Sequence, residues 1–369
     1  MLIVRSPVRI SFAGGGTDLP AYFQQYGGAV LSTAINKYFY TFLGRRNDDR
    51  IQIISSDLKV FGNFRDIANI QTEGELEIPL AVLKHLQCDI PIDLFLASEI
   101  PPGTGLGSSA SVCVNILKAV TVYLNHPLSK HNLAETAFYI AQHLLQRHVG
   151  KQDEYAAAYG GLNYISIQKD GTTEVQPLKL EDSTMQALQS NLMLFFTGSA
   201  HHSWTILQEQ EQSTREHRGS TVQALHEVKS LAEQMRETLC AGDLASFGLL
   251  LHKGWEAKKQ VSQRISNDHI DHLYELSRRH GAIGGKITGA GGGGFLLLYC
   301  EPEKQAAVRQ ALSEEGIREM AFAFDSQGAQ AIVNDPFIDG DKNGGSRWTF
   351  LMHTPGSAHS TWERLRSGS

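Results

Sequence analysis

Cysteine is scarce in this 369-residue chain, and its four copies, at positions 88, 113, 240 and 300, form no C-x-x-C pair. This spacing argues against a disulfide framework and a cysteine-based metal site, and it favours a reducing cytosol. Long apolar runs are missing too, since none approaches the about 20 residues of a membrane span. Arg5 and Arg9 interrupt the apolar N-terminus, which is unlike a secretory signal. We therefore expect a cytoplasmic protein with no membrane segment.

A surplus of basic residues is also lacking, because 39 acidic residues outnumber 33 lysines and arginines and give a net charge of −6. Nucleic acid and anionic membranes call for a basic surface, so neither is expected as the main partner. A phosphorylated small molecule held in a local basic pocket stays compatible with this charge. A chain of this length exceeds the size at which one core keeps growing, so two domains are expected.

Two well-known nucleotide-binding signatures are absent, although a glycine-rich turn, PPGTGLGSSA, occupies residues 101–110. The turn lacks the lysine of a P-loop, and Ser108 takes the place of the last glycine of a dinucleotide fingerprint. Alternating apolar residues at 90–96 predict a strand before the turn, and the apolar spacing of 110–124 predicts a helix after it. A helix N-terminus attracts anions. The turn therefore predicts a phosphate loop, in preference to a tight turn with a serine N-cap.

A second cluster of interest runs from Arg9 to Asp18. Arg9 lies opposite Val8 and Ile10 on an alternating strand, so it can point into a cleft, although a surface arginine is the alternative. The glycines at 14–16 remove side-chain bulk where a ligand could approach. Asp18 can accept hydrogen bonds from sugar hydroxyls or cap the turn that follows.

Two further features lie farther along the chain. Asp153 starts a short helix, where a carboxylate either caps the helix or orients and deprotonates an attacking hydroxyl. The glycine run at 289–294 is costly in chain entropy, and close packing against a ligand or another glycine loop explains it best. A last strand is expected at 321–324.

Together these blocks resemble the motifs of the GHMP kinases, the superfamily of galactokinase and mevalonate kinase. P-x-x-x-G-L-G-S-S-A matches residues 101–110, and G-A-G-x-G-G matches residues 289–294. Within the superfamily, SFAGGGTDLPAYF at 11–23 and VGKQDEYAAAYGGLNYI at 149–165 look most like the D-glycero-D-manno-heptose 7-phosphate kinases.

The resemblance implies an α+β fold of two domains with the nucleotide site at their junction. An N-terminal ribosomal-protein-S5-like domain would span 1–180, a C-terminal α/β sandwich domain 181–333, and a loosely structured tail 334–369. The implied reaction transfers the γ-phosphoryl group of ATP to the anomeric hydroxyl of heptose 7-phosphate or heptose, for nucleotide-activated heptose in surface polysaccharide. Another anomeric sugar kinase, of the fucose or galactose type, and a catalytically weak sensor on the same fold are the alternatives.

The resemblance also assigns roles to residues. It makes Arg9 and Asp153 catalytic, with Ser109 as an Mg²⁺ ligand, and it leaves a homo-oligomer open. Lys258 or Lys259 would meet a sugar phosphate. The ATP phosphates would lie on Pro102, Gly103, Thr104, Gly105, Leu106, Gly107, Ser108 and Ser109, and the sugar on Gly15, Gly16, Thr17, Asp18, Lys151, Gly291 and Gly292.

One position departs from the superfamily pattern. A glutamate that holds Mg²⁺ is expected about eleven or twelve residues before Asp153, where this chain has Gln142 and Ala141. Gln142 is only a weak substitute for a carboxylate, and the nearest upstream acid on that helix is Glu135. The resemblance therefore leaves the second metal ligand unassigned.

Overall fold

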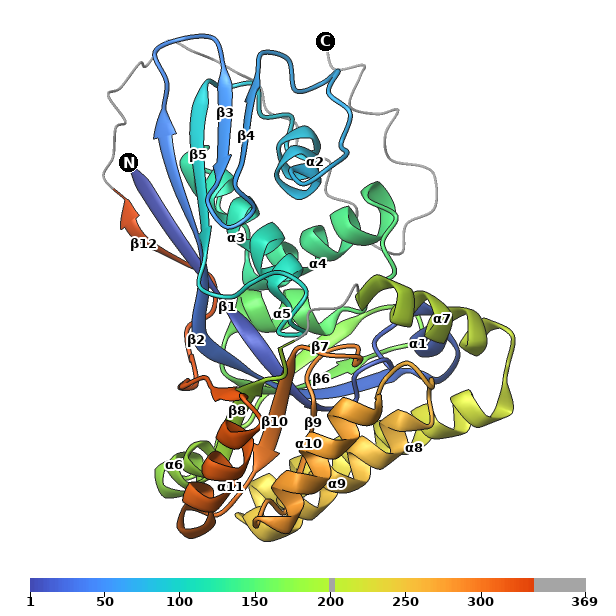
Figure 1. Ribbon diagram of the computed structural model, residues 1–369. Helices are drawn as coiled ribbons and strands as arrows, with labels where there is room; N and C mark the ends of the chain where they lie inside the picture. The colour runs from blue at the N-terminus through green and yellow to red at the C-terminus, as the bar shows by residue number, and fades with distance from the viewer. Residues whose placement is uncertain (199–202, 335–369) are drawn as a thin grey trace.

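The computed structural model describes residues 1–198 and 203–334, and Figure 1 draws its ribbon. The larger sheet of the described residues has the strand order β12-β1-β2-β5-β3-β4, and β6 extends it by pairing with β2 and β7. The pairs are antiparallel except β3 with β5, which is parallel. The strands are β1 (Leu2–Ala13), β2 (Gly28–Arg45), β3 (Ile51–Ser55), β4 (Val60–Phe64), β5 (Ile92–Ser98), β6 (Leu162–Ile167), β7 (Thr173–Pro177) and β12 (Gln330–Asn334).

Helices from the first half of the chain pack beside this sheet (Figure 1). Both α3 and α5 contact β1 and β2, while α2 and α4 pack against α3. The predicted apolar helix is α3, whose Val114 and Leu117 are fully buried in the core of this domain. These elements are α1 (Pro20–Tyr26), α2 (Glu77–His85), α3 (Ser108–Tyr123), α4 (Lys130–Tyr139), the π-helix η1 (Ile140–Leu144) and α5 (Gln152–Tyr159).

A smaller sheet with the order β11-β8-β10-β9 forms the centre of the second half of the chain. Its strand β10 is buried throughout and pairs antiparallel with both β8 and β9. The strands are β8 (Leu192–Phe196), β9 (Gly284–Ile287), β10 (Phe295–Tyr299) and β11 (Arg318–Glu319). The helices are α6 (Asp182–Asn191), α7 (Ser203–Arg215), α8 (Gly219–Cys240), α9 (Leu244–Lys259), α10 (Asp268–Arg279) and α11 (Pro302–Glu314).

One apolar cluster joins the two halves. It contains Ile10 and Phe12 of β1 together with Phe247 of α9 and Leu297 of β10. Phe12 and Phe247 meet edge to face with ring centroids 5.3 Å apart. The halves therefore share a buried core, in which β1 of the first sheet packs with α9 and with β10 of the second sheet. The observed architecture is the expected α+β fold of two domains.

The chain returns to the larger sheet at the end of the described residues, because β12 pairs antiparallel with β1. The expected range 181–333 for the second domain stays our proposal, and its last residues lie in β12, which joins the larger sheet. The strand expected at 321–324 is wrong, since Phe324 forms only one isolated bridge, to Ile35. A boundary near residue 180 stays our proposal. The predicted tail falls at 335–369, outside the described residues.

No helix within the described parts of the chain is both long enough and apolar enough to cross a bilayer.

Candidate active site

A cavity of about 650 Å³ lies where the two domains meet. The first domain contributes the turn after β1 and the glycine-rich turn before α3. The second domain contributes Leu207 of α7, Lys258 of α9, and Gly289 and Ala290 of the second glycine run. The sequence-predicted residues on its wall are Arg9, Gly15, Gly16, Asp18, Pro102, Gly103, Gly105, Gly107, Ser108, Ser109 and Asp153.

The two glycine runs pack backbone against backbone beside this cavity. A Cβ added at Gly105 would lie 2.4 Å from the carbonyl oxygen of Thr288, and one added at Gly289 would lie 2.7 Å from the Cα of Gly105. Gly105 and Gly107 also have φ angles of +80° and +78°, which disfavour any side chain. The expectation that the glycine run at 289–294 packs against another glycine loop is therefore confirmed.

The helix start predicted to bind phosphate lies on the cavity wall. Gly107, in the left-handed conformation, caps α3, and Ser108 and Ser109 form its first turn. The Oγ of Ser109 accepts a hydrogen bond of 2.6 Å from Nη1 of Arg147, whose Nη2 pairs with Glu77. Arg147 was not predicted from the sequence, because nothing in its local pattern distinguishes it from a solvated arginine. It brings a cation to the turn where a phosphate is expected.

Arg9 and Asp153 bind each other beside the glycine-rich turn that holds Gly105 and Gly107. Both Nε and Nη2 of Arg9 lie 2.7 Å from Oδ1 of Asp153, while Nη1 donates to the carbonyl oxygen of Gly105 at 2.6 Å. The Arg9 side chain is 4% exposed, and that of Asp153 is 28% exposed. A Cβ at Gly107 would come within 3.1 Å of Oδ2 of Asp153, so the carboxylate borders the loop. The two residues expected to be catalytic therefore form one unit.

Asp18 ties the turn after β1 to the helix that carries Asp153. Its Oδ1 accepts the N–H of Gly16 at 2.8 Å, and its Oδ2 accepts the N–H of Gln152, the first residue of α5, at 3.1 Å. Burial raises the pKa of the Asp18 carboxyl, and the nearby charge of Asp153 raises it further. Asp18 therefore holds α5 rather than only capping its own turn, while it still borders the cavity.

Lys258 is the basic side chain that α9 places at the cavity wall. Its Nζ donates to the carbonyl oxygen of Gly15 at 2.9 Å and to Oε1 of Gln210 at 3.3 Å. Burial lowers the pKa of Lys258 to about 8, an effect that the charge of Asp18 opposes. Its neighbour Lys259 pairs instead with Glu256 at 2.9 Å. Of the two lysines that the sequence left equal, the structure brings Lys258 to the cavity.

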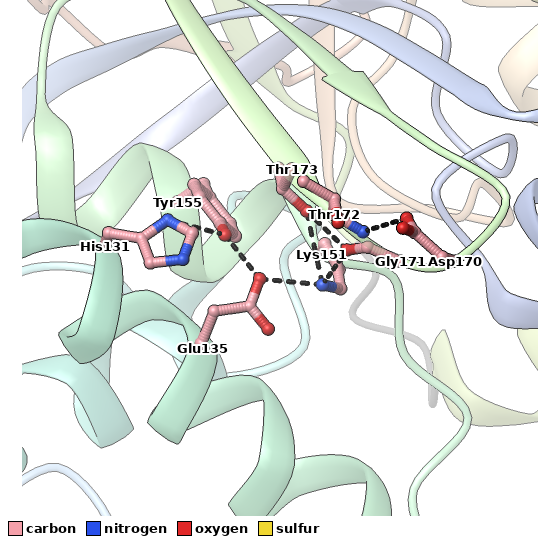
Figure 2. Close-up of polar contacts among 8 residues, drawn as sticks. All are labelled: His131, Glu135, Lys151, Tyr155, Asp170, Gly171, Thr172 and Thr173. Atoms are coloured by element: carbon pink, nitrogen blue, oxygen red, sulfur yellow. Dashed lines mark hydrogen bonds and ion pairs between the residues drawn. The ribbon is translucent and has the colours of Figure 1, made fainter. Parts of the chain in front are cut away.

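Lys151 is not among the residues that line the cavity, so its expected role in substrate binding stays a prediction without support from the cavity wall. Figure 2 shows its side chain in a separate network, where its Nζ donates to Oε1 of Glu135 at 2.7 Å and to the carbonyl oxygen of Gly171 at 2.7 Å. The hydroxyl of Tyr155 donates to the same oxygen of Glu135. This network anchors α5 to α4. It also engages Glu135, the acid left as an upstream candidate for the metal.

Other predicted residues support the loops from within. Thr17 donates to the carbonyl oxygens of Gly14 and Ala29 at 2.8 and 3.0 Å, and Thr104 donates to that of Pro101 at 2.9 Å. Leu106 is fully buried in the core shared by the domains. These side chains shape the turns without bordering the cavity.

Gly291 and Gly292 pack against Ile265 and not against the cavity. A Cβ at Gly291 would lie 2.8 Å from the carbonyl oxygen of Ile265, which also accepts the N–H of Gly292 at 2.8 Å. The sugar-binding role expected for both therefore gains no support from the cavity wall and stays a prediction. Gln142 is likewise absent from the cavity wall, whereas Ala141 beside it is present. The π-helix η1 carries both residues.

Comparison with known proteins finds GHMP kinase domains in both halves of the chain. A model described as the GHMP kinases N terminal domain matches residues 77–161, and one described as GHMP kinases C terminal matches residues 235–318. The D-glycero-alpha-D-manno-heptose 7-phosphate kinase of Campylobacter jejuni is 30% identical over 332 residues, which cover 89% of this chain and 97% of that protein.

Two further relatives are informative. The crystal structure of a D-glycero-D-manno-heptose 1-phosphate kinase from Bacteroides thetaiotaomicron superposes with a TM-score of 0.77 at 28% identity, covering 91% of this chain and all of that one. The bifunctional fucokinase/GDP-fucose pyrophosphorylase of Arabidopsis thaliana is 26% identical over 84% of this chain, which spans only 31% of that longer protein.

Matches in both halves, and a relative that aligns over nearly the whole chain, define the class: a kinase with a two-domain architecture and its cavity at the domain junction. The chain belongs to the GHMP kinase family. It is accordingly an ATP-dependent phosphotransferase.

Proposed function

We propose that this protein is an anomeric sugar kinase that transfers the γ-phosphoryl group of ATP to the C1 hydroxyl of a D-glycero-D-manno-heptose phosphate or of the free heptose. The observation that carries the proposal is the Arg9–Asp153 pair, which borders the loop of Gly105 and Gly107 in one cavity. Phosphoryl transfer requires mainly positioning and charge stabilisation, and a cation beside a carboxylate at a phosphate loop can supply both.

The proposed chemistry follows from the hydrogen bonds of Asp153. Its Oδ1 holds both contacts from Arg9, which leaves Oδ2 to receive the sugar hydroxyl. The hydroxyl oxygen attacks the γ-phosphorus, its proton passes to Asp153, and the bond between that phosphorus and the β,γ-bridging oxygen breaks to release ADP. Arg9 stabilises the negative charge that develops on the transferred group, and it also keeps the loop in register through Gly105.

The phosphates of ATP would lie at the start of α3, where Ser108 and Ser109 border the cavity and Arg147 adds a positive charge. Mg²⁺ fits this place because the Oγ of Ser109 is a hard oxygen ligand on the wall, and nucleotide-borne Mg²⁺ needs few protein ligands. When bound, the ion would neutralise charge on the β- and γ-phosphates.

Heptose is proposed as the acceptor because relatives aligned over about nine-tenths of the chain or more are named heptose phosphate kinases. Lys258 would bind the 7-phosphate of a phosphorylated heptose. The product would be a heptose 1-phosphate or 1,7-bisphosphate, which serves the formation of nucleotide-activated heptose. We place the reaction in the cytoplasm, where ATP is available and where the free cysteines among the described residues would stay reduced.

A substrate panel tests the proposal. The purified protein is given ATP with heptose, heptose 7-phosphate, fucose or galactose, and ADP release and the phosphorylated position are measured. We expect 1-phosphorylation of a heptose, and a loss of about 10²-fold or more in kcat for Asp153→Asn. Asp49→Asn, at a residue whose side chain is 74% exposed, is the matched control. Turnover confined to fucose or galactose would replace the proposed acceptor, and nucleotide binding without any turnover would favour a sensor.

A further inference from the structure

The carboxylate that the family pattern expects for the metal is missing from its usual helix. Ala141 lines the cavity at one of the two expected positions, and it has no side-chain ligand to offer. Gln142 does not border the cavity, and Glu135 is engaged with Lys151 and Tyr155 (Figure 2). If the protein uses Mg²⁺ with its nucleotide, as the proposed function requires, another element has to supply the carboxylate.

Glu154 has the properties of that missing ligand. It follows Asp153 in the first turn of α5, lies on the cavity wall, and is only 2% exposed. Its Oε2 is buried and has no hydrogen-bond partner among the described residues. A buried carboxylate oxygen left without a partner is costly, because it has lost its hydration without any compensating contact. Because Glu154 is a residue of the cavity wall, a cation bound there could supply the partner that Oε2 lacks.

The surrounding charges do not compensate Glu154. Asp18 and Asp153 are the carboxylates close enough to act on it, and both have the same sign of charge. Arg9 is the nearby cation, but its guanidinium is already used by Asp153 and by the carbonyl oxygen of Gly105. Lys258 donates to Gly15 and Gln210. The guanidinium of Arg9 is therefore engaged by other partners, and no hydrogen bond within the described residues compensates the buried Oε2 of Glu154.

The position of Glu154 also suits a cation that Ser109 would bind as well. Helices α3 and α5 pack against each other, and Cys113, one helical turn after Ser109 on α3, borders the same cavity. The charge of Glu154 acts on the thiol of Cys113, as does that of Arg147, the residue bound to Ser109. Ser109, Cys113, Ala141 and Glu154 all line this cavity, and the charge of Glu154 reaches Cys113 on α3.

We propose that Glu154 supplies the carboxylate ligand of the nucleotide-borne Mg²⁺, with Ser109 as the hydroxyl ligand, and so replaces the acid absent at positions 141 and 142. Mg²⁺ usually keeps several waters and takes one or two carboxylates besides phosphate oxygens. This is consistent with the described residues, which contain no group of three or more His, Cys, Asp or Glu able to hold a metal by themselves. Ligation requires Arg147 to release Ser109, and Arg147 can keep its ion pair with Glu77.

The test measures nucleotide binding rather than turnover. Calorimetry gives the affinity of ADP and of a non-hydrolysable ATP analogue with excess Mg²⁺ and with EDTA. For Glu154→Gln, which keeps the shape and removes the charge, we expect unchanged affinity in EDTA and a loss of about tenfold or more of the strengthening caused by Mg²⁺. Glu303→Gln, on the exposed surface of α11, controls for the loss of one negative charge.

A rescue variant separates ligation from a structural role. Ala141→Glu in the Glu154→Gln background returns a carboxylate to the same cavity, so it should restore the Mg²⁺ effect. Thermal melting without ligands checks the fold, and we expect no loss of melting temperature on removing an unpaired buried charge. Glu154→Asp, which keeps the charge, should retain part of the Mg²⁺ effect and serves if Glu154→Gln fails to fold.

Two results would overturn the proposal: a wild-type Mg²⁺ effect in Glu154→Gln, or an equal weakening of nucleotide binding with and without Mg²⁺. Failure of the proposed function is distinguishable from both. In that case the wild-type protein would bind Mg-nucleotide through Glu154 and phosphorylate none of the sugars.

Discussion

Lys258 gives the second domain a basic side chain at the cavity wall. Its present partners are the carbonyl oxygen of Gly15 and the side chain of Gln210, both neutral acceptors, and the Gln210 contact is long at 3.3 Å. A phosphate on the sugar would be a stronger acceptor, since charge-assisted hydrogen bonds are about twice as strong as neutral ones. Lys258 is therefore suited to distinguish phosphorylated from free sugars.

This role predicts a selective defect in Lys258→Met. At pH 7 we expect KM for heptose 7-phosphate to rise about 10–100-fold, which corresponds to the loss of a hydrogen bond to a charged group. KM for the unphosphorylated sugar should change little. Lys259→Met is the matched control, because Lys259 pairs with Glu256. Steady-state kinetics on both sugars check the prediction, and an equal rise of both KM values would contradict it.

The pH dependence has a defined sign. Burial lowers the pKa of Lys258 to about 8, so the ammonium predominates below that pH and is lost as the pH rises through it. KM for heptose 7-phosphate should therefore increase above pH 8 in the wild-type protein and stay flatter in Lys258→Met. Asp18 opposes this shift by favouring the ammonium, and Lys286 nearby is a second buried lysine whose pKa burial lowers, to about 7.

Single residues were predictable from the sequence only where a motif defined them. Arg9 and Asp153 were both expected to be catalytic, and the structure brings them together. Lys151 lies two positions before Asp153, yet its side chain binds Glu135 (Figure 2), whereas that of Asp153 binds Arg9. Glu154 and Arg147 gave no signal, because burial and the lack of a partner are properties of the packed chain.

At the scale of elements, the conformation of the glycine-rich turn at 101–110 depends on its backbone contact with Thr288 and Gly289 of the second domain. Gly105 occupies a left-handed conformation and leaves no room for a Cβ beside Thr288. The loop is thus shaped by a neighbour 183 positions later in the sequence. This explains why glycines recur in both runs: each allows the other backbone to approach.

Gly105→Ala should damage both stability and nucleotide binding. We expect a loss of about 2–4 kcal/mol in the free energy of unfolding, since the left-handed backbone costs about 1–2 kcal/mol and a clash with a backbone oxygen adds to it. Gly316→Ala is the control, because its φ of +77° is similar but nothing lies within 4 Å of the added Cβ. Denaturant unfolding and nucleotide titration measure the two effects; equal destabilisation by both variants would exclude the packing explanation.

Elements near a motif were easier to predict than elements defined by long-range pairing. The strand, turn and helix around residues 101–110 appear as β5, the phosphate loop and α3. The segment 321–324 alternates like a strand but forms only an isolated bridge at Phe324. The last strand of the larger sheet is β12, which begins at Gln330. The π-helix η1 was not expected either, since a single added residue within a helix leaves the apolar pattern nearly unchanged.

For the whole molecule, the core shared by the two domains says more about how they are held together than the position of the domain boundary does. Side chains of β1, β2 and β6 pack in one cluster with those of α8, α9, β8 and β10. The resemblance placed the cavity at the domain junction, but it gave no hint that the junction is apolar as well as polar. Composition alone cannot reveal this, because Phe12 and Phe247 are 235 positions apart and only the folded chain brings them together.

This shared core predicts that the two domains unfold together. Phe12 is 1% exposed and Phe247 is fully buried, so Phe12→Ala or Phe247→Ala should each cost about 3–5 kcal/mol. The double variant should lose less than the sum, because the two rings contact each other. Leu80→Ala, in the separate core of the first domain, should instead add to Phe247→Ala without coupling. Denaturant unfolding followed by fluorescence and circular dichroism is expected to give one coincident transition for all variants, whereas two separate transitions would mean that the junction does not couple the domains.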